Sequence, residues 1–168
     1  MNPQTTSTLL PVHPVGVRAA PGAAFRYIPR SGVDVTFERN AGSGNGNVDP
    51  LDRLWPRRVR SIIRKALSRW EPADFIETAE LLASELVTNA LEHGHGDVRV
   101  LLTFTDGRMR LDVRDGSPES PVLREASALD ETGRGLFIVK AAADGWGVSE
   151  DGTTTWCTLA LPSLGPTP

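Results

Sequence analysis

Glu85-Leu-Val-Thr-Asn-Ala-Leu-Glu-His93 is the stretch that decides the fold, because its pattern predicts the second half of an amphipathic helix. Glu85 and Asn89 are four residues apart, so both side chains project from one helix face. The opposite arc is apolar and contains Ala79, Ala83, Leu86, Val87 and Ala90. Leu81 and Leu82 share the polar arc, and this mixture predicts a partly covered surface such as the wall of a pocket.

The composition is that of a globular protein with one domain. The chain has 168 residues, which is enough for one domain with a core, and 39% of them are hydrophobic. Its net charge of -3 gives no electrostatic case for direct nucleic-acid binding. The single cysteine, Cys157, excludes an internal disulfide framework and fits a reducing compartment. No membrane span or secretory signal is recognisable, so we expect a cytoplasmic location and no membrane association.

The first 31 residues differ from the rest of the chain. They contain five prolines, several arginines and no acidic residue. Proline removes backbone donors and interrupts apolar periodicity, so we expect residues 1–31 to be a disordered tail. The folded domain is then predicted to span residues 32–162, and residues 163–168 form a second tail.

Hydrophobic periodicity predicts three helices and at least four mostly antiparallel strands. Asp74 is expected to cap the helix that contains Glu85, and Gly94 to follow its end in the C′ position. The sum is an α+β fold, a two-layer sandwich with the helices on one face of the sheet. The expected elements are a strand at 32–39, helices at 52–70 (with Pro56 suited to an N1 position), 74–93 and 136–144, and hairpins at 98–113 and 146–161.

The expected helix at 52–70 has one strongly basic face. Its apolar stripe alternates with a set of six basic side chains: Arg57, Arg58, Arg60, Arg64, Lys65 and Arg69. We favour a solvated helix face as the interpretation. The alternative is a docking face for an acidic partner.

The register of the first expected hairpin directs a carboxylate inward. Asp106-Gly107 is a type I′ turn signal, which places Phe104 opposite Met109 and Val100 opposite Val113. Extending this row by one step puts Asp115 on the apolar face. A carboxylate there is costly unless a group bonds to it, so Asp115 is a candidate site residue.

A long segment between the hairpins ends in a glycine motif. Residues 116–132 contain two prolines and no strong periodicity, which is typical of a functional or mobile loop. Gly133-Arg134-Gly135 follows, at the start of an expected helix. Small residues there let backbone N–H groups approach a phosphate, and the helix dipole favours negative charge.

These features together describe an ATP–Mg²⁺ pocket without a Walker A sequence. Asn89 supplies a neutral oxygen ligand, which suits a Mg²⁺ ion that keeps most of its waters and also touches phosphate. Glu85 could take a proton from a water or a hydroxyl nucleophile. Asp115 could accept a hydrogen bond from the exocyclic amine of adenine.

Four segments resemble the GHKL superfamily of ATPases and kinases, in the order that the family has them. ELVTNALEH (85–93) is similar to its N box, VRDGSPESP (113–121) to its G1 box, TGRGLFIVKAAADGWG (132–147) to its G2 box and DGTTTW (151–156) to its last strand box. The resemblance covers residues 53–161 and implies the Bergerat ATP-binding fold. The greatest similarity is to the small, stand-alone anti-sigma factor serine/threonine kinases.

The resemblance implies a role for each matching residue. It assigns Asn89 to Mg²⁺, Glu85 to the general base and Asp115 to the adenine amine. The main-chain donors for the phosphates would come from Gly133, Arg134, Gly135 and Leu136, with the segment that begins at Gly116 as a lid. Thr153 matches the threonine that supports adenine through Asp115, although the run of three threonines leaves that choice open.

The expected activity is transfer of the γ-phosphate of ATP to a small antagonist protein, combined with sequestration of a sigma factor, and the resemblance suggests a homodimer. A nucleotide-gated binding module without efficient phosphotransfer is the alternative. A fragment of a histidine kinase is disfavoured, because the sequence has no dimerisation helix with a phosphoacceptor histidine.

Overall fold

The structure is a computed structural model, and it describes residues 23–28, 32–40, 47–69, 71–105, 107–116 and 134–162. For residues 23–28 and for Arg134 only the backbone is described. Residues 117–132 of the lid expected at 116–132, Gly133, Asp106 of the hairpin turn and the tail residues 1–22 and 163–168 lie outside these ranges.

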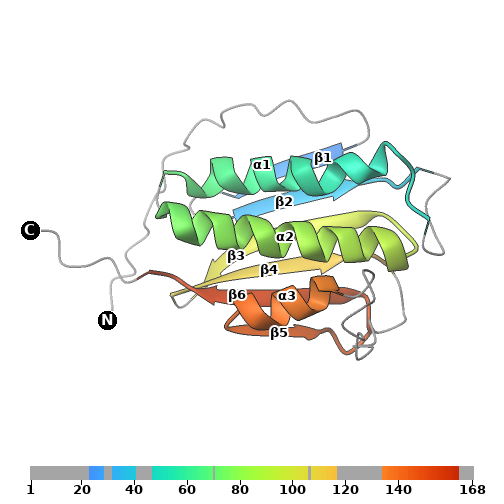
Figure 1. Cartoon of the computed structure of the whole chain (residues 1–168). Helices are drawn as coiled ribbons and strands as arrows, with labels where there is room; N and C mark the ends of the chain where they lie inside the picture. The colour runs from blue at the N-terminus through green and yellow to red at the C-terminus, as the bar shows by residue number, and fades with distance from the viewer. Residues whose placement is uncertain are drawn as a thin grey trace, which may run out of the picture.

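Six antiparallel strands form one sheet in the order β1-β2-β3-β4-β6-β5 (Figure 1). Three α-helices cover one face of it, with α2 between α1 and α3, so the expected two-layer α+β sandwich is confirmed. The strands are β1 Ala23–Ile28, β2 Gly32–Phe37, β3 Val98–Thr105, β4 Arg108–Arg114, β5 Gly145–Val148 and β6 Thr154–Ala160. The helices are α1 Trp55–Leu67, preceded by a 3-10 turn at Asp52–Leu54, α2 Ala73–His93 and α3 Arg134–Ala142.

The sheet begins inside the segment that the sequence assigned to the N-terminal tail. Strand β1 pairs with β2 over its whole length, from Ala23 opposite Phe37 to Ile28 opposite Gly32. The tail prediction for residues 1–31 was therefore wrong at its C-terminal end. The prediction failed because proline content was read over the whole segment, whereas no proline lies between Ala23 and Ile28.

Apolar side chains from the helices and the sheet meet in one core. Helix α1 buries Val59, Ile63 and Leu67 at helical spacing. The rings of Phe37 and Trp55 stack with centroids 4.0 Å apart and fix the start of α1 on β2. The described helices include none with the length and apolar character that a membrane span requires.

Both predicted caps of α2 differ from the structure. Pro72, not Asp74, occupies the N-cap position, and the Asp74 side chain accepts from the neighbouring Phe75 N–H instead. Gly94 is the C-cap residue, but its backbone is extended (φ -81°, ψ 173°) rather than left-handed. The helix therefore ends without the glycine motif that would satisfy its last carbonyl groups.

The register of the first hairpin is as predicted. Phe104 pairs with Met109 and Val100 with Val113, so the apolar side chains of β3 and β4 share the face under the helices. Gly107 adopts the positive φ of 71° that the first turn needs. The pairing ends at Arg99 and Arg114, which leaves Asp115 just beyond the last pair.

Candidate functional site

Glu85 lies where α2 contacts the first turn of α3. A Cβ atom placed on Gly135 would come within 2.9 Å of the Glu85 carboxylate oxygen Oε2. Partial burial raises the pKa of Glu85, and the nearby charge of Glu92 raises this pKa further. A carboxyl group with a raised pKa is better matched to proton transfer near neutral pH than an ordinary glutamate.

Asn89 lies one helical turn beyond Glu85 on the same helix. Its side chain is half-buried, and it has no hydrogen-bond partner among the residues that the structure describes. An amide held at a partly covered surface without a protein partner is able to ligate a cation or a bound solute.

Asp115 lies close to the end of α2, because Gly94 lets the two backbones approach. A Cβ on Gly94 would come within 2.5 Å of the Asp115 Cβ. The Asp115 backbone is fixed on both sides, since its N–H donates to Thr153 O at 3.1 Å and its carbonyl accepts from His95 N at 3.2 Å. The structure thus brings the end of β4 to the end of the helix that carries Glu85 and Asn89.

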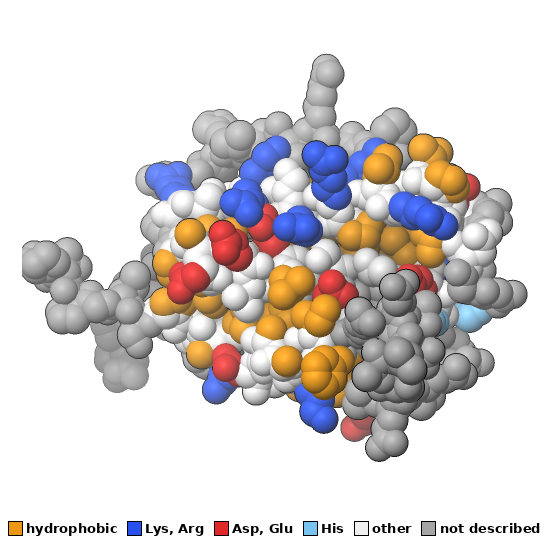
Figure 2. Space-filling model, viewed as in Figure 1, with side chains coloured by type: hydrophobic (Ala, Val, Ile, Leu, Met, Phe, Trp, Pro, Cys, Tyr) orange, Lys and Arg blue, Asp and Glu red, His pale blue; other side chains and the backbone are white. Residues whose placement is uncertain are grey.

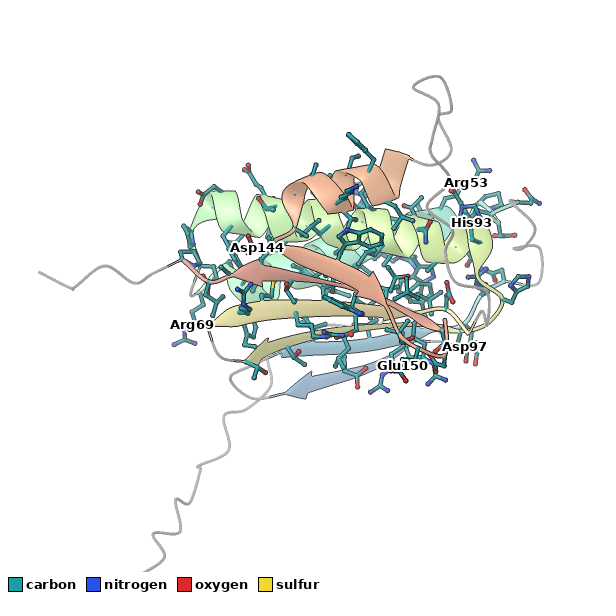
Figure 3. The ribbon with its side chains drawn as sticks, turned by 90° about the horizontal axis from the view of Figure 1, so that it is seen from below. Arg53, Arg69, His93, Asp97, Asp144 and Glu150 are labelled. Carbon is teal, nitrogen blue, oxygen red and sulfur yellow. The ribbon has the colours of Figure 1, made fainter. Side chains whose placement is uncertain are left out.

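Several segments gather at this end of the molecule. His93 at the end of α2, Asp97 before β3 and Glu150 before β6 all lie at the end where Arg53 precedes α1 (Figure 3). Arg69 and Asp144 lie at the opposite end. The candidate site is therefore at one end of the sandwich, between the helical layer and the sheet.

The glycines of the expected phosphate site are only partly described. Gly116 has a positive φ of 70°, and a Cβ placed on it would lie 3.6 Å from the Gly96 Cα, so the chain turns tightly beside Gly96 directly after Asp115. Gly133 and residues 117–132 of the expected lid lie outside the described residues. Arg134 opens α3, and Gly135 and the buried Leu136 follow in its first turn, where free backbone N–H groups are expected.

The threonine run contains a candidate that the sequence did not single out. The Thr153 hydroxyl is bonded to the Asp151 carboxylate at 2.9 Å, so it is engaged in the β5–β6 turn. Thr155 is instead buried, and it pairs with Val113, two residues before Asp115. Strand alternation is the signal that identifies it, since Thr155, Cys157 and Leu159 share the buried face of β6.

Arg39 is a second residue that the sequence analysis missed. It follows β2, and its guanidinium donates to the carbonyl groups of Ala90, Leu91, Gly94 and Gly96. No local sequence pattern predicts this, because the donor and the acceptors are more than 50 residues apart.

The residues present fit a nucleotide with Mg²⁺. The described residues include no group of three His, Cys, Asp or Glu side chains that could hold a metal ion. Asn89 has a side-chain oxygen that is not engaged by a described residue, and Mg²⁺ is commonly held by one or two protein ligands together with water and phosphate. The absence of a Cβ at Gly135 keeps the first turn of α3 open beside Glu85, as the approach of phosphate oxygens to backbone N–H groups requires.

Comparison with known proteins matches the part of the chain that carries these residues. A family model described as histidine kinase-like ATPase domain matches residues 54–159, more than half of the chain. The match includes α2, β3, β4 and α3, with Glu85, Asn89, Asp115 and Gly135. It does not include β1, β2 or Arg39. No curated protein matches the chain.

Proposed function

Because the chain belongs to the histidine kinase-like ATPase domain family, within the GHKL superfamily, we propose that it is an ATP-dependent serine/threonine kinase of the anti-sigma factor type. The observation that carries this proposal is the position of Glu85, a partly desolvated carboxyl group beside the N-terminal turn of α3. A base at the edge of a phosphate site is the arrangement that transfer to a hydroxyl group requires.

In the proposed reaction, Glu85 accepts the proton of a serine or threonine hydroxyl on a small antagonist protein. The hydroxyl oxygen forms a bond to the γ-phosphorus, the bond from that phosphorus to the β–γ bridging oxygen breaks, and ADP leaves with the electron pair. Mg²⁺ would supply charge neutralisation on the phosphates. The backbone N–H groups of Gly135 and Leu136 would orient the phosphate oxygens, while Asn89 holds the metal.

Adenine selection is assigned to Asp115. Its carboxylate would accept from the exocyclic amine, and the adjoining turn at Gly116 gives the base access to the strand end. Thr155 is our candidate for the supporting hydroxyl, because Thr153 is already bonded to Asp151.

A groove between α1 and α2 is the surface that we assign to the protein partner. It has a volume of about 510 Å³ and is lined by Arg53, Pro56, Arg57, Arg60, Ser61, Arg64, Glu80 and Ser84. Lys and Arg side chains gather along α1 above it (Figure 2). Helix α1 contains five basic residues and no acidic residue, although the whole chain has a net charge of -3. Charge complementarity therefore favours an acidic segment of a protein as the occupant.

The free cations of this groove come from α1. Arg64 is bound by both carboxylate oxygens of Glu80 at 2.6 Å, and Glu80 is only 2% exposed. Within the described part of the chain, Arg57 and Arg60 have no carboxylate partner. An arginine fork can bind a carboxylate through two parallel hydrogen bonds, which suits recognition of an acidic segment.

The groove also leads toward the candidate catalytic residue. Arg53 and Pro56 line a second hollow of about 260 Å³ together with Val48, Thr88, Leu91 and Glu92. Glu92 is close enough to Glu85 to raise its pKa. A partner bound along α1 would thus extend toward Glu85, which supports phosphotransfer over nucleotide binding alone.

The decisive experiment incubates the protein with labelled ATP, Mg²⁺ and small candidate proteins encoded near its gene. The kinase proposal expects label on a serine or threonine of one of them. Glu85→Ala should retain ATP binding and lose at least about a hundredfold in transfer rate. Asn89→Ala should weaken Mg²⁺-dependent ATP binding by about 10–100-fold. Tight nucleotide binding with label on no partner would instead support the nucleotide-gated binding module.

A further inference from the structure

Helix α2 is capped at its C-terminus by a side chain from the other layer. Arg39 donates through Nε to Gly96 O at 2.9 Å, and through one terminal nitrogen to Gly94 O at 2.5 Å and Leu91 O at 3.2 Å. The other terminal nitrogen donates to Ala90 O. One guanidinium therefore donates to four carbonyl groups, two in the last turn of α2 and two in the segment that follows.

This arrangement replaces the missing helix cap. The last carbonyl groups of a helix have no intrahelical donor and carry partial negative charge, so a cation there is favourable. The extended conformation of Gly94 does not form the usual backbone cap. A Cβ on Gly94 would come within 2.7 Å of an Arg39 terminal nitrogen, so the absence of a side chain admits the guanidinium.

The same guanidinium feels the charges of two carboxylates, Asp115 and Asp52. Desolvation lowers the pKa of Arg39, while the charges of Asp115 and Asp52 raise it. Asp52 is fully buried, and it accepts from the backbone N–H and the side-chain amide of Asn40 at 3.0 and 2.6 Å. The residue after Arg39 is thus held in place, which restricts where the guanidinium can go.

We propose that Arg39 is a positioning residue for Asp115, and that it thereby sets the preference of the site for adenine. Arg39 binds two carbonyl groups in the last turn of α2 and the carbonyl group of Gly94, the C-cap residue. Gly94 lies against the Asp115 Cβ, and the charge of Arg39 acts on the Asp115 carboxylate. Removing the guanidinium removes this positive neighbour of the Asp115 carboxylate and the bonds that fix the segment beside it. We expect the phosphate end to change less, because Arg39 makes no described bond to the side chains of Glu85 and Asn89 or to α3. This inference rests on the proposed role of Asp115 as the adenine reader.

The test compares ATP with purine riboside 5′-triphosphate, which lacks the exocyclic amine, by titration calorimetry. A charge-assisted hydrogen bond from the amine to Asp115 predicts that the wild-type protein binds ATP about tenfold more tightly than the amine-free nucleotide, which is an affinity ratio of about ten. In Arg39→Met this ratio should fall to about one, and the affinity for the amine-free nucleotide should change less than threefold. Arg39→Lys keeps the charge but loses the fork, so its ratio should lie between the two.

A purely structural role of Arg39 makes a different prediction. In that case the Arg39 variants would have a lower melting temperature, but the folded variants would keep the wild-type ratio of affinities for ATP and the amine-free nucleotide. Arg99→Met is the matched control, because Arg99 binds Asp34 across β2 and β3 on the other face of the sheet. An unchanged ratio in either folded Arg39 variant overturns the positioning role. Equal binding of both nucleotides by the wild-type protein overturns the adenine-reader role of Asp115 itself.

Discussion

The carboxylate of Glu85 occupies the space that a side chain on Gly135 would need, since a Cβ there would lie 2.9 Å from Oε2. Ala is a better helix former than Gly by about 1 kcal/mol, so Gly135→Ala should not destabilise α3 by itself. The Glu85 side chain must move instead. A displacement of about 1 Å at a reacting group can reduce turnover by about a hundredfold.

We therefore expect Gly135→Ala to retain the melting temperature and to lose about 10–100-fold in phosphotransfer or ATP hydrolysis. Gly96→Ala is the control, because a Cβ there would meet Asp115 O at an ordinary 3.5 Å. If the loss acts through Glu85, then Gly135→Ala should have little additional effect in a Glu85→Ala background. Equal losses in both backgrounds would show that the new methyl group acts on the phosphate site directly.

Glu85 also predicts a pH dependence of stability. Its folded-state pKa is raised, so its protonated form stabilises the folded state at low pH. This contribution is present below the ordinary pKa of about 4.5 and is lost as the pH rises through the higher folded value. The ionised group therefore costs stability at neutral pH.

Glu85→Gln should then be more stable than the wild-type protein at pH 7, by roughly a few tenths of a kcal/mol because the side chain is only partly buried. The gain should disappear near pH 4, where both side chains are neutral. Chemical denaturation at the two pH values measures this difference. A variant that is less stable than wild type at pH 7 would indicate that the carboxylate is stabilised by a partner.

The elements with regular apolar periodicity could be predicted from the sequence. The hairpin of β3 and β4 is the clearest example, because a two-residue turn and alternating apolar residues fix the pairing of Phe104 with Met109. The same alternation places Thr155 on the buried face of β6, although the motif alone favoured Thr153.

Contacts between distant segments could not be predicted in this way. Arg39 contacts carbonyl groups at the end of α2, and neither the arginine nor its acceptors have a sequence signature. Strand β1 was missed for a different reason, because the proline content of residues 1–31 was read over the whole segment although its described part, Ala23–Ile28, contains no proline. The convergence of Glu85 with Gly135 depends on helix packing, whereas their sequence motifs predict only that each is a candidate.

The α1–α2 groove gives a prediction for partner binding. Arg57→Glu with Arg60→Glu should weaken binding of a phosphorylatable partner at least about tenfold. The two guanidinium groups that attract an acidic segment are then replaced by carboxylates that repel it. ATP affinity should not change, since neither residue belongs to the nucleotide site. The weakening should diminish at high salt, where charges on the surface are screened.

Lys140→Glu with Arg108→Glu is the matched control, because it makes the same change in net charge at exposed positions on α3 and β4. Both double variants are measured by titration calorimetry with the same partner. Equal weakening by the two pairs would mean that the partner responds to overall charge and not to the groove. Duplex DNA should not bind more tightly than an acidic peptide if the groove selects a protein segment.

The buried thiol of Cys157 offers a probe of the sheet. Cys157 is fully buried in β6, between β4 and β5, and burial raises the pKa of its thiol to about 12. The nearby Asp112 raises this pKa further, and Arg110 opposes the shift. The thiolate is the reactive form. The folded protein therefore protects Cys157 in two ways, because burial blocks the reagent and the raised pKa keeps the thiol protonated.

A disulfide reagent at pH 8 should therefore label native Cys157 at least about a thousandfold more slowly than the protein in urea. The native labelling rate should follow the equilibrium between folded and open protein, because β6 is an interior strand of the sheet. A ligand that binds only the folded state reduces the open population, so a nucleotide should slow the labelling further. Rapid labelling without denaturant would instead require local separation of β6 from β4 or β5.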